Sequence, residues 1–259
     1  MSCIHRITVE ARRVEAEGIP LLLSFAPREG RRPLVLILHG LGSHKARNSL
    51  VPPNHFGLIG AGFAVASYDA RAHGGREVAG WLDPQSELPR GGLRAMLEMA
   101  QGTAEDGCHV LDELADHPVV DTARIGAIGV SMGALVLQGL LVREERIRAA
   151  VLIHGGDGWG AAQSLLPSAD PETLAQLEEI DPAGRPEAFF PRPILCLNGE
   201  QDPYFPPSAA EAFLARLGPS YASFPEWLDQ RTFPGVGHET VEPMREAAVA
   251  WMVRFLEAR

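Results

Sequence analysis

The segment Gly129-Val130-Ser131-Met132-Gly133 places a serine between two glycines in the pattern Gly-X-Ser-X-Gly. It follows a strand-like run, residues 124–130, and begins a helix-like run, residues 132–142. A serine on such a sharp strand-to-helix turn, with small residues on both sides, presents its hydroxyl above the sheet. The N–H groups of the first helical turn are then aimed at a reacting carbonyl oxygen. We therefore expect Ser131 to act as a nucleophile.

A serine nucleophile needs a base to take its proton, and the base needs a carboxylate to orient it. Asp202 follows the predicted strand 193–197, and His238 lies in a glycine-flanked loop before the last predicted helix. The order Ser, Asp, His along the chain is the order found with serine elbows of this kind. We expect Asp202 to be the acid and His238 the base, with Asp157 as an alternative acid.

The oxyanion of the reaction would need backbone donors close to Ser131. The predicted strand 33–38 ends in His39-Gly40-Leu41-Gly42-Ser43, whose glycines let the backbone approach a ligand. We expect the N–H groups of Leu41 and Met132 to form the oxyanion hole. His39 lies far upstream of the other candidates and is expected to support this loop rather than act as the base.

Short β-rich runs alternate with longer helical patterns, which is typical of a mostly parallel sheet with helices on both faces. The expected strands are 4–11, 19–26, 33–38, 63–68, 124–130, 149–153, 193–197 and 230–233, and the expected helices are 54–62, 93–114, 132–142, 208–217 and 243–258. The first two strands, joined by a polar turn at 15–18, should form an antiparallel edge. The fold class is therefore α/β, with one doubly wound, eight-stranded domain.

The long connection 155–192 between two predicted strands is rich in glycine and proline. Connections of this length are usually functional, so we expect a small lid or cap over the site. Its aromatic residues Trp159, Phe189 and Phe190, together with Trp81 from another loop, are candidates for the substrate pocket. A compact cap of this size would favour a small acyl group.

Composition and charge limit the kinds of partner that the chain is expected to have. Its 259 residues carry a net charge of −10, which disfavours nucleic acid and anionic lipid as partners. No apolar run is long enough for a signal peptide or a membrane span. Three separated cysteines without C-X-X-C spacing favour the cytoplasm. The histidines follow no metal-binding motif, so we expect neither a metal nor a cofactor.

The chain resembles the α/β-hydrolase superfamily in five motifs that span nearly its whole length. They are His39-Gly40-Leu41-Gly42, Asp69-Ala70-Arg71-Ala72-His73-Gly74, the serine elbow, Asn198-Gly199-Glu200-Gln201-Asp202 and Gly237-His238. Its size is similar to that of small bacterial esterases of the dienelactone hydrolase and prolyl-oligopeptidase-like branch. The resemblance implies the same nucleophile, acid and base, acting on a small-molecule carboxylic ester, with a thioester or small amide as the alternative.

Other interpretations of the sequence remain open. Gly156-Asp157-Gly158-Trp159-Gly160-Ala161 satisfies G-X-G-X-X-A after a predicted strand, as in NAD(P)-dependent oxidoreductases, but the acids that follow it lie in a helical pattern. A non-catalytic binding protein of the same fold would normally lack one of the three catalytic residues. Arg71 and His73 could contact a substrate carboxylate, although we expect them to pair with neighbouring loop groups.

Overall fold

The computed structural model describes residues 9–50, 54–83, 89–156, 159, 171, 175 and 181–256. The strands are β1 (Glu10–Ala16), β2 (Ile19–Phe25), β3 (Arg32–Leu38), β4 (Ala64–Tyr68), β5 (Val120–Val130), β6 (Ile147–Ile153), β7 (Ile194–Gly199) and β8 (Leu228–Phe233). The α-helices are α1 (Lys45–Leu50), α2 (Asn54–Gly60), α3 (Gly92–Ala115), α4 (Met132–Leu141), α7 (Pro207–Leu217) and α8 (Glu242–Leu256). Short 3-10 turns lie at Gly74–Arg76, Pro182–Gly184, Pro186–Phe189, Gly218–Tyr221 and Pro225–Trp227.

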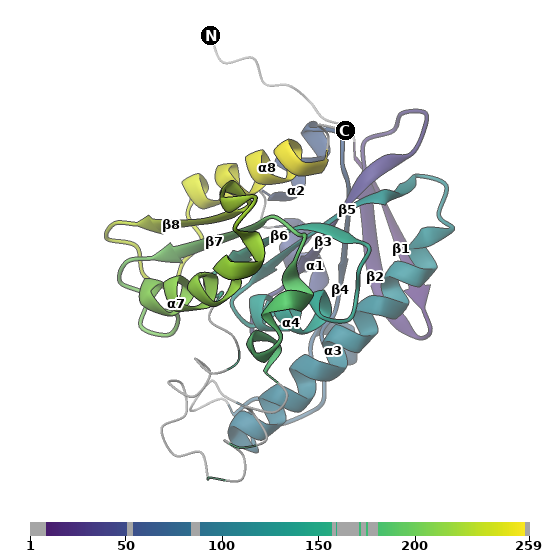
Figure 1. Ribbon diagram of the computed structural model, residues 1–259. Coiled ribbons are helices and arrows are strands. Elements are labelled where there is room, and N and C mark those ends of the chain that lie inside the picture. Colours follow the sequence, from purple (N-terminus) through teal and green to yellow (C-terminus); the bar gives the residue numbers. More distant parts are fainter. Residues whose placement is uncertain are drawn as a thin grey trace.

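All eight strands form one sheet in the order β1-β2-β4-β3-β5-β6-β7-β8 (Figure 1). The strands from β4 to β8 pair in parallel, and β2 pairs antiparallel with both β1 and β4. The expected eight-stranded, mostly parallel sheet is confirmed. The chain winds in opposite directions from β3, to β4 on one side and β5 on the other. Ligand sites of such sheets lie at this reversal, beyond the carboxyl ends of the strands.

The edge hairpin differs from the expectation. β1 runs to Ala16, which pairs with Ile19, so the turn consists of Glu17 and Gly18 alone. Both turn residues have positive φ, 49° and 81°, and such two-residue turns match the twist of the flanking strands. The predicted start of this strand, residues 4–8, lies outside the described residues.

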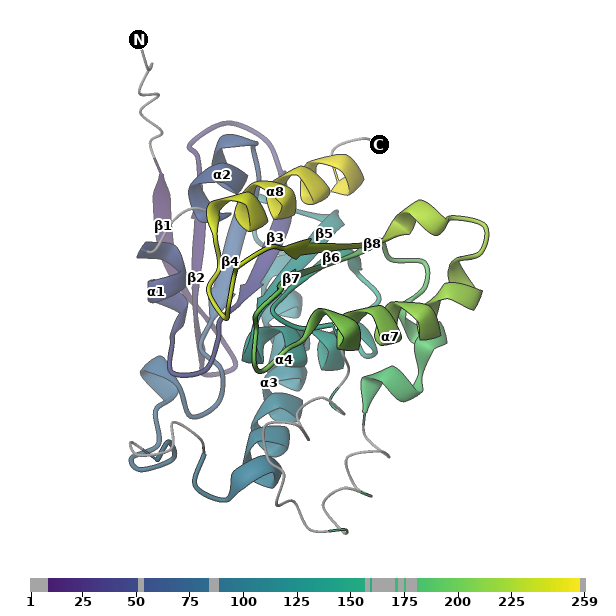
Figure 2. The same ribbon diagram turned by 90° about the vertical axis from the view of Figure 1, so that its left-hand side faces the viewer.

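Helices cover both faces of the sheet, because successive side chains of a buried strand point to opposite sides. In β3, Leu34, Leu36 and Leu38 belong to one buried cluster, while Val35 and Ile37 belong to another. Helices α3, α4 and α7 cover the first face, and α2 and α8 cover the second (Figure 2). No helix in the part of the chain described here is long and apolar enough to cross a membrane.

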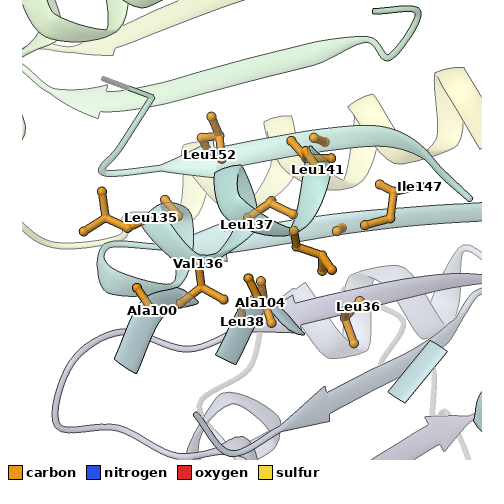
Figure 3. Packing of buried hydrophobic residues seen from close by; sticks show 14 of the residues in the cluster. Leu36, Leu38, Ala100, Ala104, Leu135, Val136, Leu137, Leu141, Ile147 and Leu152 are labelled. Atoms are coloured by element: carbon orange, nitrogen blue, oxygen red, sulfur yellow. The ribbon is translucent and has the colours of Figure 1, made fainter. Parts of the chain in front are cut away.

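Each of the ten residues of helix α4 is buried. It packs between the sheet and α3, where Val136 lies with Ala100 and Ala104 in the same cluster (Figure 3). A helix that is buried on all sides is stabilised mainly by its packing in the core. The first turn of α4 therefore has a rigid support.

Candidate active site

Ser131 occupies a strained turn between β5 and α4. Its φ of 55° and ψ of −119° lie in a region that residues other than glycine rarely adopt. A Cβ at Gly129 would lie 2.3 Å from the carbonyl oxygen of Gly133, and a Cβ at Gly133 would lie 2.2 Å from that of Leu38. The glycines on both sides of the serine are thus required by packing against backbone, which cannot move aside.

Two neighbouring strands fix the position of this turn. The N–H of Ser131 donates to the carbonyl of Ile153 at the end of β6, at 2.8 Å. On the other side, a Cβ at Gly40 would lie only 3.6 Å from the Cβ of Ser131. The serine therefore lies at the carboxyl edge of the sheet, beside the loop that leaves β3.

The structure brings Ser131, His238 and Asp202 together in a chain of hydrogen bonds. The Ser131 hydroxyl donates to Nε2 of His238 at 2.9 Å, and Nδ1–H of His238 donates to Oδ2 of Asp202 at 2.8 Å. His238 packs against the rings of Tyr204 and Phe205, whose centroids are 5.1 and 5.7 Å away. This arrangement leaves a lone pair of Nε2 available for the serine proton.

Asp202 is held as a buried carboxylate by four hydrogen bonds. Its Oδ1 accepts the backbone N–H groups of Tyr204 and Phe205 at 2.9 and 3.0 Å, while Oδ2 accepts from His238 and from His154. Burial alone would raise the pKa of Asp202, but the hydrogen bonds from the two histidines and the backbone together hold that pKa far below its usual range. The carboxylate is therefore charged at neutral pH.

His154 was not among the residues expected from the sequence. It follows β6 directly, its side chain is 2% exposed, and its Nδ1–H donates to Oδ2 of Asp202 at 2.9 Å. Its Nε2 is buried and has no hydrogen-bond partner among the described residues. The carboxyl-end rule for parallel strands could have found it, because the chain passes the catalytic edge of the sheet at this point.

The loop after β3 contains Leu41, one of the two N–H donors expected to form the oxyanion hole. Leu41 lies one residue from Gly40, and Met132 is the first residue of α4, so its N–H has no acceptor within the helix. His39 supports this loop as expected: it donates from Nδ1 to the Gly40 carbonyl and accepts the N–H of Ala70 at Nε2. Burial lowers the pKa of His39 to about 4, which keeps the ring neutral and able to accept.

A buried ion pair joins the loops on this edge. Asp69 follows β4 and accepts hydrogen bonds from the N–H and Nζ of Lys45 and from the N–H of Gly75. Arg71 forms a two-pronged pair with Asp106 of α3, at 3.0 and 2.8 Å. The expectation that Arg71 pairs with a nearby acid is confirmed.

Trp159 does not form a wall of the site as expected. It is fully buried in the main core, and its indole N–H donates to the carbonyl of Leu135 at 3.0 Å. A Cβ at Gly139, about two helical turns beyond Ser131, would lie 3.1 Å from the ring. The indole thus extends along α4, away from the serine, because its apolar ring and its N–H are both satisfied there.

The assignment of Phe189 and Phe190 to the substrate pocket is also wrong. Phe189 is buried edge-on against Phe213 of α7, and Phe190 packs on Tyr221. The chain here returns to the amino-terminal end of β7: Arg192 donates to the carbonyl of Ile147, the first residue of β6. These rings therefore lie near the amino-terminal ends of the parallel strands, whereas the site lies at their carboxyl ends.

Trp81 is half-buried near the loop that leaves β3. Its ring contacts His73 edge-on at 5.1 Å, and His73 in turn lies 5.3 Å from His39. The alternative acid Asp157, and most of the expected lid at 155–192, lie outside the described residues. Tyr204, which is 46% exposed beside His238, is a second residue that sequence reasoning missed.

A sheet of this order, with a serine elbow after β5 and loops from β7 and β8 returning to it, defines an α/β-hydrolase. The chain belongs to the prolyl oligopeptidase family, whose model matches residues 93–258. It is therefore a hydrolase, and the expected α/β-hydrolase superfamily is confirmed, with the prolyl oligopeptidase family as its place within it.

Three relatives extend this comparison. The chain is 23% identical to the Bacillus subtilis (strain 168) protein named "Putative esterase YitV", over 92% of this chain and 96% of that protein. The crystal structure of TT1662 from Thermus thermophilus matches with a TM-score of 0.80 and 28% identity, covering 98% of this chain and all of that one. A puromycin-hydrolyzing peptidase of Mycobacterium tuberculosis matches with a TM-score of 0.72 and 20% identity, covering 99% of this chain but 40% of that one.

Proposed function

We propose that the protein is a serine esterase that hydrolyses carboxylic esters of small acyl groups through an acyl-enzyme on Ser131. The observation that carries the proposal is the chain of hydrogen bonds from Ser131 through His238 to Asp202, at 2.9 and 2.8 Å. Its similarity to a protein named as an esterase favours an ester as the substrate.

In the first half of the reaction, Nε2 of His238 accepts the Ser131 proton while Oγ forms a bond to the acyl carbon. The carbonyl oxygen becomes an oxyanion, which the N–H groups of Leu41 and Met132 stabilise. His238 then gives its proton to the leaving alcohol as the ester bond breaks. Asp202 stabilises the imidazolium during both transfers.

In the second half, His238 takes a proton from water, whose oxygen attacks the acyl carbon. The tetrahedral intermediate collapses, the bond to Ser131 Oγ breaks, and the proton returns to that oxygen. The products are the carboxylic acid and the free enzyme. No step requires a group beyond the side chains and N–H groups named above.

An amide is the second candidate substrate class, and a specific finding favours it. The family is named for an oligopeptidase, and one structural neighbour is a puromycin-hydrolyzing peptidase. The same triad performs both reactions, so the two classes differ in how the leaving group is bound and protonated.

A panel of nitrophenyl esters, thioesters and aminoacyl nitroanilides of matched acyl groups separates these classes. We expect kcat/KM to be highest for the esters, and Ser131→Ala to abolish turnover of each substrate. A higher kcat/KM for the aminoacyl amides would replace the esterase by a peptidase. A lack of turnover of any substrate, with no labelling of Ser131 by a phosphonate, would refute both.

The cellular location is proposed on the sequence alone. Cys3, Cys108 and Cys196 lie far apart in the sequence, and their spacing gives no disulfide pattern. This usage favours the cytoplasm. Fractionation of cells that express the protein would test it.

A further inference from the structure

We propose that His154 is a positioning residue, which shares the Asp202 carboxylate with His238 and thereby sets how strongly that carboxylate holds the protonated base. The effect on ester hydrolysis rests on the proposed function, whereas the sharing of Asp202 by the two histidines does not. Four observations carry it: the shared oxygen, the location of the two rings, the burial of His154 and its unpaired nitrogen.

The two histidines bind the same oxygen atom. Nδ1 of His154 lies 2.9 Å from Oδ2 of Asp202, and Nδ1 of His238 lies 2.8 Å from it. The ring centroids are 4.8 Å apart, with an angle of 51° between the planes. Because the second oxygen of Asp202 is occupied by two backbone N–H groups, the carboxylate cannot rotate to give each histidine an oxygen of its own.

The backbone places His154 in this position. Its N–H donates to the carbonyl of Leu197 at 2.8 Å, which extends the pairing of β6 with β7 by one residue. Its φ of 51° is positive, a conformation that is unfavourable for a residue with a Cβ. A residue held in this conformation directs its side chain towards the loop after β7, where Asp202 lies.

Packing alone does not explain a histidine at this position. The side chain is 2% exposed, and Nε2 is buried without a hydrogen-bond partner in the part of the chain that the structure describes. A buried polar atom without a partner is unfavourable, and an apolar side chain would avoid that penalty. The N–H at Nδ1 is the one polar group of the ring that is satisfied, and its acceptor is the acid of the triad. The role of the ring is therefore to donate a hydrogen bond to Asp202.

A second hydrogen-bond donor to Oδ2 weakens the interaction between Asp202 and His238. A carboxylate that accepts several hydrogen bonds has less negative charge to offer each donor. Without the N–H of His154, Asp202 would stabilise the imidazolium form of His238 more strongly, and His238 would stay protonated to higher pH. His154 therefore weakens the interaction of Asp202 with the protonated base.

The charged and titratable groups around the base are few in the described part of the chain. His238 faces Asp202, His154 and the Ser131 hydroxyl, with the Tyr204 ring edge-on at 5.1 Å. Glu239, the next residue in the chain, is exposed. Since only His154 differs between the variants below, these other groups act equally in all of them.

The test compares His154→Leu, which removes the N–H, with His154→Asn, whose side-chain amide can replace it. Histidine ¹³Cε1 signals are followed from pH 4 to 10, and His238 is identified by the signal missing in His238→Gln. We expect the midpoint of the His238 titration to rise by about half a unit to one unit in His154→Leu and to remain within experimental error of wild type in His154→Asn. An unchanged midpoint in His154→Leu, or equal shifts in both variants, would overturn the inference.

A measurement on the wild-type protein covers the case in which a variant does not fold. Long-range ¹H–¹⁵N spectra distinguish the two neutral forms of each histidine ring. We expect His154 to carry its proton on Nδ1 at pH 8, and a proton on Nε2 alone would overturn the inference, because Nδ1 could not then donate to Asp202.

The kinetic arm uses the ratio of kcat/KM on a short-chain ester at pH 6 to that at pH 8.5. We expect this ratio to fall about three- to tenfold in His154→Leu and to be unchanged in His154→Asn. An unchanged ratio in His154→Leu would overturn the role in catalysis. If the wild-type protein neither hydrolyses esters nor is labelled at Ser131, the proposed function fails, and the two NMR measurements still decide the role of His154.

Discussion

Replacing Asp202 by asparagine should disable the base without removing it. The carboxylate accepts two N–H groups at each oxygen, whereas an amide has only one oxygen to accept with. If that oxygen keeps the backbone N–H groups of Tyr204 and Phe205, the amide NH2 faces Nδ1 of both histidines. Each ring must then carry its proton on Nε2, and His238 can no longer accept the proton of Ser131.

The loss should be about 10⁴-fold in kcat, which corresponds to about 5.5 kcal/mol of transition-state stabilisation. The assay is the hydrolysis of a short-chain nitrophenyl ester, with circular dichroism to show that the variant is folded. Asp157→Asn is the matched control, because Asp157 was the alternative acid in the sequence, and it should keep activity near that of wild type. An Asp202→Asn variant with more than a tenth of wild-type activity, or a loss confined to Asp157→Asn, would refute the reasoning.

Three further predictions follow from the same structure. Trp159→Ala should lower the free energy of unfolding by about 3–5 kcal/mol, measured in urea, and Trp159→Phe should lower it by less. An unchanged midpoint of urea unfolding in Trp159→Ala would contradict the burial of Trp159 on α4. Burial opposes the lowered pKa values of Asp69 and Asp202, but their hydrogen bonds outweigh it. These carboxylates therefore stabilise the fold fully above the unfolded pKa of about 4, and stability should fall as pH drops further. Asp69→Asn should cost about 3 kcal/mol at pH 7 and flatten this decline, and thermal melts from pH 3 to 7 would show it. Finally, kcat/KM on nitrophenyl esters should be highest for acyl chains of about C2 to C6, and an optimum at C10 or longer would contradict a small acyl pocket.

The sequence predicted the sheet and two of the three hydrogen-bonded residues, Ser131 and Asp202, for one physical reason. Parallel strands buried on both faces are continuous apolar runs, and the residues that follow them gather at one edge. Ser131 and Asp202 each follow such a run, so their proximity could be inferred before the structure. His238 follows the polar strand β8, and it was assigned from its glycine-flanked loop and from the order Ser, Asp, His along the chain. Strand β5 is longer than expected because a register shift opposite Pro33 and Leu34 brings polar residues into its first half.

His154 and Trp159 could not be assigned in the same way, because their roles depend on tertiary packing. His154 also follows a parallel strand, but only its positive φ and its contact with Asp202 show that the ring turns towards the acid. Trp159 lies in the segment expected to form a lid, yet α4 offers its indole space beside Gly139 and the carbonyl of Leu135 as an acceptor. Neither feature of α4 is visible as a pattern in the sequence.

The central claim is that Ser131 is the nucleophile activated by His238, and labelling by a fluorophosphonate tests it most directly. Intact mass and peptide mapping should show one phosphonyl group per chain, located on Ser131, with loss of ester hydrolysis in proportion to labelling. Ser131→Ala should take up no label and lose about 10⁴-fold or more in kcat while keeping its fold. Labelling at another residue, or hydrolysis by Ser131→Ala at the wild-type rate, would contradict the claim.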